Sequence, residues 1–243
     1  MNETHSILQD LEDAIARGTA DSRERALWHA TDLLIAGRYC EEEIATFGEV
    51  IGRLADEIET EARAKLAHRL ARIEYSPASV VRKLAFDDAI EVAGPVLRES
   101  ERLDDVALLE NARTKSQAHL LAISIRRVLS RAVTDILLRR GNDEVVHSTV
   151  SNPGADLSER SVDALLDRAA QDGDLAACLA LRPDLPRHLF LKLVAKASAA
   201  VRARLETANP KLAQEVSQAV RTAGRRARSA TVALTSQTEL HIG

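Results

Sequence analysis

Apolar residues recur along the chain with a period close to 27 residues. Leucines spaced by 26, 28, 28 and 27 residues mark the period: Leu103, Leu129, Leu157, Leu185 and Leu212. In the first four cases the next residue is of a type that starts helices: Asp104, Ser130, Ser158 and Pro186. A fixed period of this length is typical of repeat proteins, in which each unit is one small group of packed elements.

The positions around each leucine predict two helices per unit. The residue seven positions earlier is apolar in every unit: Val96, Ala122, Val150, Cys178 and Leu205. The residue four positions later is apolar in all units but one: Ala107, Val133, Leu189 and Val216. Positions eight after the leucine repeat this pattern with Asn111 as the exception, and residues four apart share one helix face. We therefore predict two short helices joined by a turn, which bury their apolar faces by stacking on neighbouring units.

The period divides the chain into three regions. Six units run from about 62 to 223, and the first unit has Ser76 as the predicted N-cap before Pro77. Residues 1–61 break the period and predict a helical N-terminal cap, and residues 224–243 predict a flexible basic tail with Arg225, Arg226 and Arg228. The fold class is thus predicted as all-α, an α-solenoid of about six stacked helical hairpins with a helical N-terminal cap.

Local signals place helix ends within these regions. Asp21-Ser22 is expected to cap a helix that stops near Gly37, and Glu41-Glu42-Glu43 is expected to open the next helix. Gly94-Pro95 should break or kink a helix, because proline lacks the amide hydrogen and its ring clashes with the preceding turn.

Composition agrees with a helical, membrane-free chain. Forty alanines and 32 leucines stand against six aromatic residues, which favours packed helices over strands. No apolar run approaches the roughly 20 residues that span a bilayer, and the first residues lack a secretory signal, so we expect a cytoplasmic protein. Cys40 and Cys178 are expected to be buried, reduced thiols.

Six blocks in order resemble one bacterial family. They are Phe47–Leu54, Leu84-Ala85 with Asp87–Leu97, Ser116–Ser124, Arg140–Asn142, Ser151–Ala155 and Arg182–Pro186. Over roughly residues 25–220 the chain resembles the family known as domain of unknown function 2336. The resemblance implies a helical fold of the HEAT-like or leucine-rich-repeat-variant kind, and it implies no activity, substrate or catalytic residue. The tail after about 223 lies outside the pattern of that family.

No catalytic, cofactor-binding or metal-binding signature is present in the sequence. The phosphate-binding G-x-x-x-x-G-K-[ST], the dinucleotide-binding G-x-G-x-x-G, H-E-x-x-H and C-x-x-C are all missing. His119 and His147 both lie ten positions before a repeat leucine. Shared metal ligation needs both rings about 2 Å from one ion, whereas packed helices are about 8–10 Å apart. We therefore favour capping or packing histidines and expect no cofactor, no metal and no catalytic residue.

Arg126 and Arg182 both lie three positions before a repeat leucine, at the predicted turn of their units. A guanidinium there either forks onto a carboxylate or phosphate of a partner, or it ties carbonyls or an acidic side chain of its own turn. With His119 and His147, these arginines are the predicted partner-binding residues. Four further arginines are spaced to form one basic strip or a merely solvated face: Arg127, Arg131, Arg139 and Arg140.

Charge is distributed unevenly and bears on the kind of partner. Residues 40–62 hold eight carboxylates against Arg53, whereas residues 199–230 hold seven Lys or Arg against two Glu. The basic stretch is typical of nucleic-acid binding, but the aromatic side chains that stack on bases are scarce. We therefore favour a protein partner over nucleic acid.

These patterns predict a non-enzymatic adaptor that binds a protein partner on its repeat surface. The main alternative is a sensor or enzyme that holds a small anionic ligand, such as a nucleotide. Its cleft would lie between the N-terminal cap and the first repeats, where Arg82, Lys83 or Arg126 converge with a histidine. A third alternative is a DNA-binding HEAT-like protein.

Overall fold

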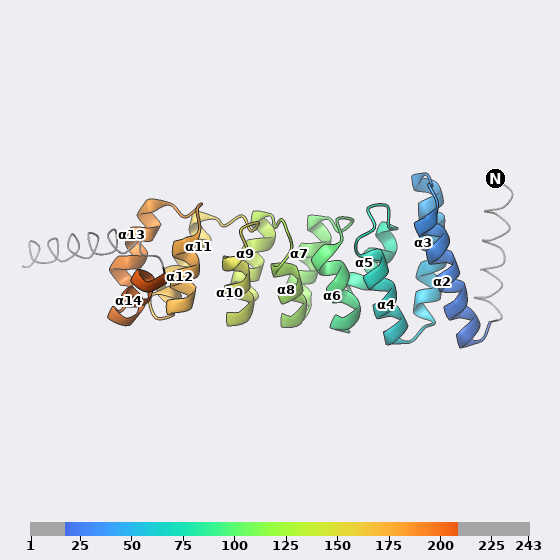
Figure 1. Cartoon of the computed structure of the whole chain (residues 1–243), viewed down its shortest axis with the longest axis horizontal. Coiled ribbons are helices and arrows are strands. Elements are labelled where there is room, and N and C mark those ends of the chain that lie inside the picture. Colours follow the sequence, from blue (N-terminus) through green and yellow to red (C-terminus); the bar gives the residue numbers. More distant parts are fainter. Residues whose placement is uncertain (1–17, 209–243) are drawn as a thin grey trace, which may run out of the picture. The chain divides into compact units, whose positions relative to one another are not determined.

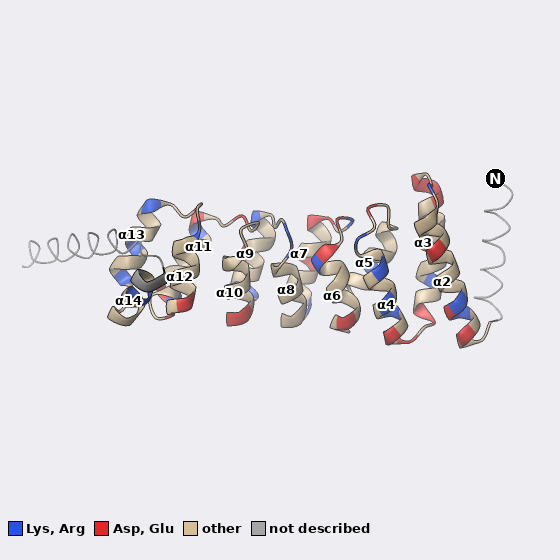
Figure 2. Cartoon of the chain, viewed as in Figure 1, with Lys and Arg blue, Asp and Glu red and all other residues tan. Residues whose placement is uncertain are grey.

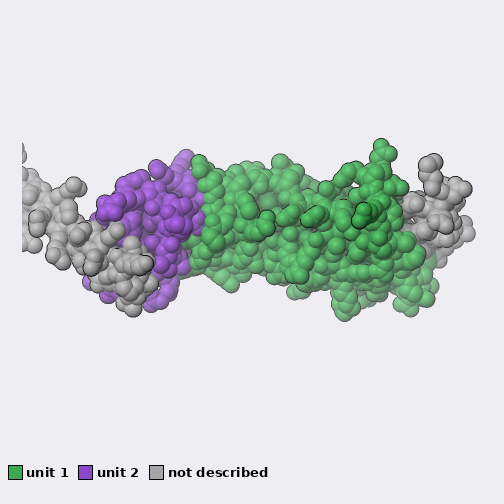
Figure 3. All heavy atoms as spheres, turned by 45° about the horizontal axis from the view of Figure 1, so that its top comes forward, with its two compact units in different colours: residues 1–156 green, residues 157–243 purple. Residues whose placement is uncertain are grey.

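The computed structural model describes residues 18–208, which form helices joined by loops. They form thirteen α-helices and no β-strand, with one isolated parallel bridge between Leu129 and Ala155. The all-α class is therefore confirmed. The chain divides into two compact units, residues 1–156 and residues 157–243, which are described separately (Figure 3).

The helices have the following bounds, with the labels of Figure 1. Unit 1 contains α2 (Ala20–Ala36), α3 (Glu41–Asp56), α4 (Thr60–Leu70), α5 (Ala78–Ala85), α6 (Ile90–Glu99), α7 (Asp105–Thr114), α8 (Gln117–Ser124), α9 (Arg131–Arg140) and α10 (Asp143–Ser151). Unit 2 contains α11 (Glu159–Ala169), α12 (Gly173–Leu181), α13 (Arg187–Lys196) and α14 (Ala199–Ala208). No helix in this part of the chain is both long enough and apolar enough to cross a bilayer.

Most of the predicted helix starts are confirmed. Asp104, Ser130 and Ser158 are the N-caps of α7, α9 and α11, and the side chain of each accepts a hydrogen bond from the backbone N–H three residues later. Pro186 is the N-cap of α13. Glu41 opens α3, where three carboxylates lie beside the positive end of the helix dipole.

Two predicted N-caps are wrong. Thr19, not Asp21-Ser22, caps α2, although this helix does end before Gly37. Pro77, not Ser76, is the N-cap of α5, because the Ser76 hydroxyl is buried and donates to the carbonyl of Leu70, 2.8 Å away. In both cases a serine near the true cap donates to a backbone carbonyl instead, Ser22 to that of Thr19 and Ser76 to that of Leu70.

The predicted break at Gly94-Pro95 does not end the helix, because α6 runs through Pro95. Residues 92–97 are all buried, and α6 packs on α4, α5 and α8. Tertiary packing of this kind stabilises a short helix more than propensity does. The missing amide hydrogen of one proline is therefore tolerated in a fully packed helix.

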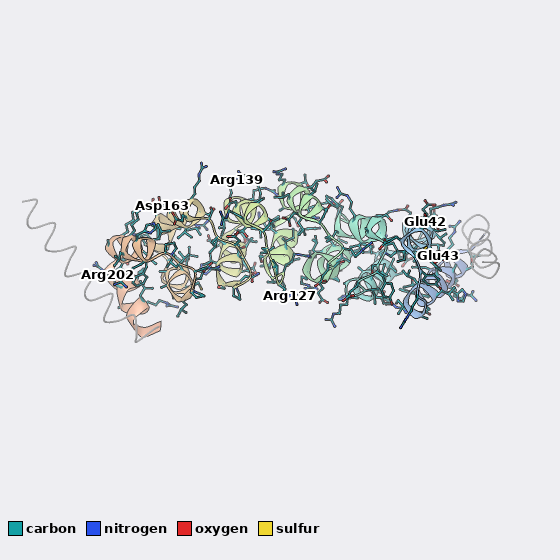
Figure 4. All side chains as sticks on the ribbon, turned by 90° about the horizontal axis from the view of Figure 1, so that it is seen from above. Glu42, Glu43, Arg127, Arg139, Asp163 and Arg202 are labelled. Carbon is teal, nitrogen blue, oxygen red and sulfur yellow. The ribbon has the colours of Figure 1, made fainter. Side chains whose placement is uncertain are left out.

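In unit 1 most helices pack mainly on the helix two places further along the chain, but α2 packs on α3, and α5 packs on α3 and α6. The helices α4, α6, α8 and α10 contact one another in that order, while α3 packs on α5 and α7 packs on α9. Figure 4 shows the helices end-on in two rows. The helix α6 packs on α5, whereas its contact with α7 is slight. The loops α4–α5, α6–α7 and α8–α9 therefore connect the rows without forming tight hairpins.

In unit 2 the helices pack in the same way. The helix α11 contacts α12 and α13, and α12 contacts α14. Lys192 and Lys196 on α13 pair with Asp163 and Asp167 on α11, at 2.9 and 2.7 Å. Exposed pairs of this kind contribute little to the free energy of unfolding, so the apolar faces determine this packing.

The predicted core columns are buried, with one exception. Val96, Val150, Leu205 and Ala122 are buried, and so are the second-column residues Ala107, Val133 and Leu189. Cys178 is half-buried, and Cys40 is exposed because it precedes the first turn of α3 at the surface. The prediction of two buried thiols is therefore wrong. Val216 and the predicted tail at 224–243 lie outside the described residues.

Two isoleucines of one segment allow a matched test of this core. Ile123 on α8 is fully buried, whereas Ile125 is 54% exposed. We expect Ile123→Ala to lower the free energy of unfolding by about 2–5 kcal/mol through loss of burial and a residual cavity. Ile125→Ala is expected to change it by no more than about 0.5 kcal/mol. Urea titrations followed by circular dichroism measure both values, and equal effects would contradict the assigned core.

Candidate functional site

A ladder of hydrogen bonds joins every second loop of unit 1: the α4–α5, α6–α7 and α8–α9 loops and the segment after α10. Arg102 Nε donates to the carbonyl of Ser76 at 3.0 Å, and Arg126 Nη2 donates to that of Ser100 at 2.8 Å. Asn152 Nδ2 donates to the carbonyl of Arg126 at 2.7 Å. In each case donor and acceptor are 26 residues apart. We call these contacts the loop ladder.

The ladder satisfies carbonyls at helix ends, which have no partner inside their own helix. Arg126 Nη1 also donates to Leu97 near the end of α6, at 2.7 Å, and Asn152 Nδ2 also donates to Ser124 at the end of α8, at 2.8 Å. Burial lowers the pKa of the Arg126 guanidinium, although the negative charges of Asp105 and Glu101 act to raise it. Arg126 therefore ties carbonyls, which is one of the two alternatives drawn from the sequence. These carbonyls belong to α6 and the α6–α7 loop, however, and not to its own turn.

A second set of contacts fixes the shape of the α8–α9 loop. Asn152 Oδ1 accepts a hydrogen bond from the Gly154 N–H at 2.8 Å. The Leu129 N–H donates to the Gly154 carbonyl at 2.9 Å, and the Leu129 carbonyl accepts from the Asp156 N–H at 3.1 Å. A Cβ atom at Gly154 would lie 1.9 Å from the carbonyl oxygen of Arg127, so only glycine fits here.

Three loops of unit 1 surround a hollow of about 540 Å³. We call it the loop groove. Its lining comes from the end of α4 and the α4–α5 loop, from α6 and the α6–α7 loop, and from the α8–α9 loop: Ala71, Arg72, Ile73, Glu74, Arg98, Glu99, Glu101, Ile125, Arg126, Arg127 and Val128. Four guanidinium groups and three carboxylates thus share one depression with exposed aliphatic side chains.

The α8–α9 loop presents apolar and basic side chains together. Ile125 and Val128 are 54% and 67% exposed, and they flank Arg126 and Arg127 in the sequence. The Arg127 side chain is 90% exposed, and the nearest carboxylate oxygen, on Glu101, is 4.0 Å from it. Figure 4 shows Arg127 at the outer side of one helix row. Large exposed aliphatic residues beside a hollow are typical of binding surfaces.

The other arginines of the groove differ in their partners. Arg72 pairs with Glu99, and this contact lowers the pKa of the Glu99 carboxyl group. Arg98 is exposed and has no ion-pair partner within 4 Å in the described part of the chain. Arg98 and Arg127 therefore have guanidinium groups with no carboxylate at hydrogen-bond distance among the described residues.

The structure assigns His119 a packing role. It is buried on α8, where Nδ1 lies 2.8 Å from the Ser116 hydroxyl and Nε2 lies 2.9 Å from the carbonyl oxygen of Asp87. His147 is half-buried on α10. Within residues 18–208 no three histidine, cysteine or acidic side chains gather to hold a metal ion.

Arg182 lies in unit 2 and binds an acidic residue of its own turn. Its guanidinium forms two hydrogen bonds with the Asp184 carboxylate, Nε to Oδ1 at 2.8 Å and Nη2 to Oδ2 at 2.7 Å. This contact lowers the pKa of Asp184, and the Arg182 side chain is only 6% exposed. Partner binding by Arg126, Arg182, His119 and His147 stays a prediction.

A second, smaller hollow of about 250 Å³ lies where α2 meets the α3–α4 segment. Its lining includes five carboxylates against one lysine: Asp21, Glu24, Glu57, Glu59 and Glu61 against Lys65. This charge disfavours an anionic ligand between the N-terminal helices. Arg82 and Lys83 do not converge with Arg126, because they pair with Glu110 and Asp56.

The basic residues do not gather in one strip. Arg127 and Arg139 lie on opposite sides of the two helix rows (Figure 4), Arg131 pairs with Asp156, and Arg140 donates to the carbonyl of Ala112. Figure 2 likewise shows basic and acidic residues interspersed over the helices. Most of the predicted basic stretch at 199–230 lies outside the described residues.

Sequence reasoning did not identify Arg98, Ile125, Val128, Asn152 or Gly154. Ile125 and Val128 are apolar residues outside the periodic columns, which is a usable signal. Asn-Pro-Gly is a turn sequence, but nothing in it says that the turn binds a loop formed 26 residues earlier.

The neighbouring arginines 126 and 127 allow a matched test of the loop ladder. Arg126→Ala removes the donors to two carbonyls, and we expect a loss of about 1–3 kcal/mol in the free energy of unfolding. Arg127→Ala removes an exposed side chain and should cost no more than about 0.5 kcal/mol. Chemical denaturation of both variants gives the comparison, and an Arg126 variant as stable as the wild type would refute the structural role.

Comparison with known proteins adds the family. The sequence profile described as "Uncharacterised protein conserved in bacteria (DUF2336)" matches residues 92–242. Neither the curated proteins nor the solved structures give a match. The profile covers the tail after 223, which the resemblance left outside the family pattern, and it does not cover the block Phe47–Leu54. Because the match spans more than half of the chain, the protein belongs to this bacterial family, domain of unknown function 2336.

Proposed function

We propose that this protein is a non-enzymatic adaptor that binds a protein partner through the loop groove. The observation that carries the proposal is the exposure of Ile125 and Val128 on either side of Arg127, at the rim of a hollow. Protein interfaces combine apolar anchors with a polar rim, and arginine is enriched in them. The groove offers both.

The fixed shape of the α8–α9 loop supports this proposal. Ordering a mobile loop on binding opposes association, and a loop that is already ordered avoids that cost. Asn152 and Leu129 hold this loop by backbone-directed hydrogen bonds on both sides of the exposed residues. The backbone that carries the exposed side chains is therefore ordered before a partner arrives.

The proposal includes the architecture. We propose that alternate helices pack on one another throughout an α-solenoid of about six 27-residue units, which is preceded by a helical N-terminal cap. Solenoids present extended surfaces built from corresponding loops of successive units, and the loop groove draws on three such loops.

A double substitution tests the adaptor function. Ile125→Asp with Val128→Asp replaces two exposed aliphatic residues by charges, and we expect at least about tenfold less of a specific partner to be retained. Val106→Asp is the matched control, because Val106 is 66% exposed in the first turn of α7, where a carboxylate is tolerated. Affinity capture of native bacterial lysate on the three full-length proteins, with quantitative mass spectrometry, measures this. Identical sets of retained proteins would contradict the proposal.

The second candidate function is a sensor or enzyme for a small anionic ligand, such as a nucleotide. It is favoured by the presence of Arg126 and three further arginines in one hollow, and opposed by the three glutamates there. For an adaptor we expect no change in melting temperature with millimolar adenine or guanine nucleotides. A rise in melting temperature that Arg98→Glu abolishes would instead favour the ligand-binding function.

A further inference from the structure

We propose that the loop groove recognises an extended peptide segment that carries Asp or Glu and aliphatic residues on the same face, at positions two apart. Arg98 and Arg127 would bind the carboxylates, and Ile125 and Val128 would contact the aliphatic side chains. This inference rests on the proposed adaptor function and specifies the chemistry of its partner.

The charges of the groove point to a carboxylate-bearing partner. Of its four arginines, Arg72 is paired with Glu99 and Arg126 is engaged with backbone carbonyls. Arg98 has no ion pair among the described residues, and Arg127 contacts Glu101 only at 4.0 Å, beyond hydrogen-bond distance. A planar guanidinium matches the two oxygens of a carboxylate, so both side chains are suited to bind one.

The apolar residues of the groove point to aliphatic neighbours of that carboxylate. Ile125 and Val128 are exposed on the same short loop as Arg127, and Ile73 of the α4–α5 loop is half-buried in the groove. An extended peptide places alternate side chains on opposite faces. Residues two positions apart therefore share a face, and a segment with an acidic residue two positions from an aliphatic one can match a surface on which guanidinium and aliphatic groups are adjacent.

The same lining disfavours a nucleotide or a nucleic acid. None of the eleven lining residues is aromatic, so no side chain of the groove stacks on a base. None is glycine, serine or threonine, the residues that line many phosphate sites. A peptide carboxylate, in contrast, can bind the arginine side chains that line the groove.

Peptide display on phage tests the inference with the full-length chain as bait. The library is depleted on the Ile125→Asp/Val128→Asp variant and then selected on the wild type. We expect the selected peptides to be enriched in Asp or Glu two positions from Leu, Ile or Val. Selection on Arg98→Glu/Arg127→Glu should enrich Lys or Arg in their place.

Affinities of one synthetic selected peptide, measured by fluorescence anisotropy, make the test quantitative. Arg98→Glu/Arg127→Glu is expected to weaken binding about tenfold or more, because each attraction becomes a repulsion. Arg113→Glu/Arg139→Glu is the matched control, since both arginines are exposed in the last turns of α7 and α9 and neither lines the groove. The control should stay within about twofold of wild type, since charges distant from a binding site are screened.

The two proposals fail in different ways. Selected peptides that depend on Ile125 and Val128 but lack acidic residues and ignore Arg98→Glu/Arg127→Glu would overturn the acidic chemistry and leave the adaptor function standing. No peptide dependent on the groove would overturn both. Circular dichroism of each variant checks that it is folded, which the exposure of Arg98 and Arg127 leads us to expect.

Discussion

Short helices leave many backbone carbonyls without a partner, and this constraint shapes unit 1. The last four carbonyls of an α-helix have no hydrogen bond within it. For α8, which has eight residues, that is half of the helix. The missing hydrogen-bond donors come from segments that follow later in unit 1. Arg126 donates to a carbonyl of α6, and Asn152 donates to one of α8. Asn111 donates to the carbonyl of Ala85 at the end of α5, at 2.6 Å. Packing and hydrogen bonding thus connect the same neighbouring segments of unit 1.

The parts of the fold that depend on local chemistry were predictable from the sequence. Asp104, Ser130 and Ser158 cap helices as expected, because a capping side chain needs only the N–H groups of the next turn. The buried columns followed from spacing alone. Pro95 shows the limit, since its local preference to end a helix yields to the packing of α6 between α4 and α8.

The site was less predictable, because its residues contact helices and loops that lie about 26–29 residues earlier in the chain. Arg126 was singled out by its place before Leu129, but the sequence does not say which carbonyls its guanidinium reaches. Asn111 looked like an exception in an apolar column, and it is buried because its amide caps α5. Exposure was equally hidden: Ile125 and Ile123 are the same residue type two positions apart, yet the first lies at the surface and the second in the core.

The α8–α9 loop places a buried arginine next to an exposed one. Arg126 points into the fold and ties α6 to the loop, whereas Arg127 is exposed. Asn152 binds the carbonyls of Ser124 and Arg126, so the backbone here is held by contacts that do not involve the side chains at 125, 127 and 128. Substitutions at those three positions are therefore expected to cost little in folding, because they leave these backbone contacts in place.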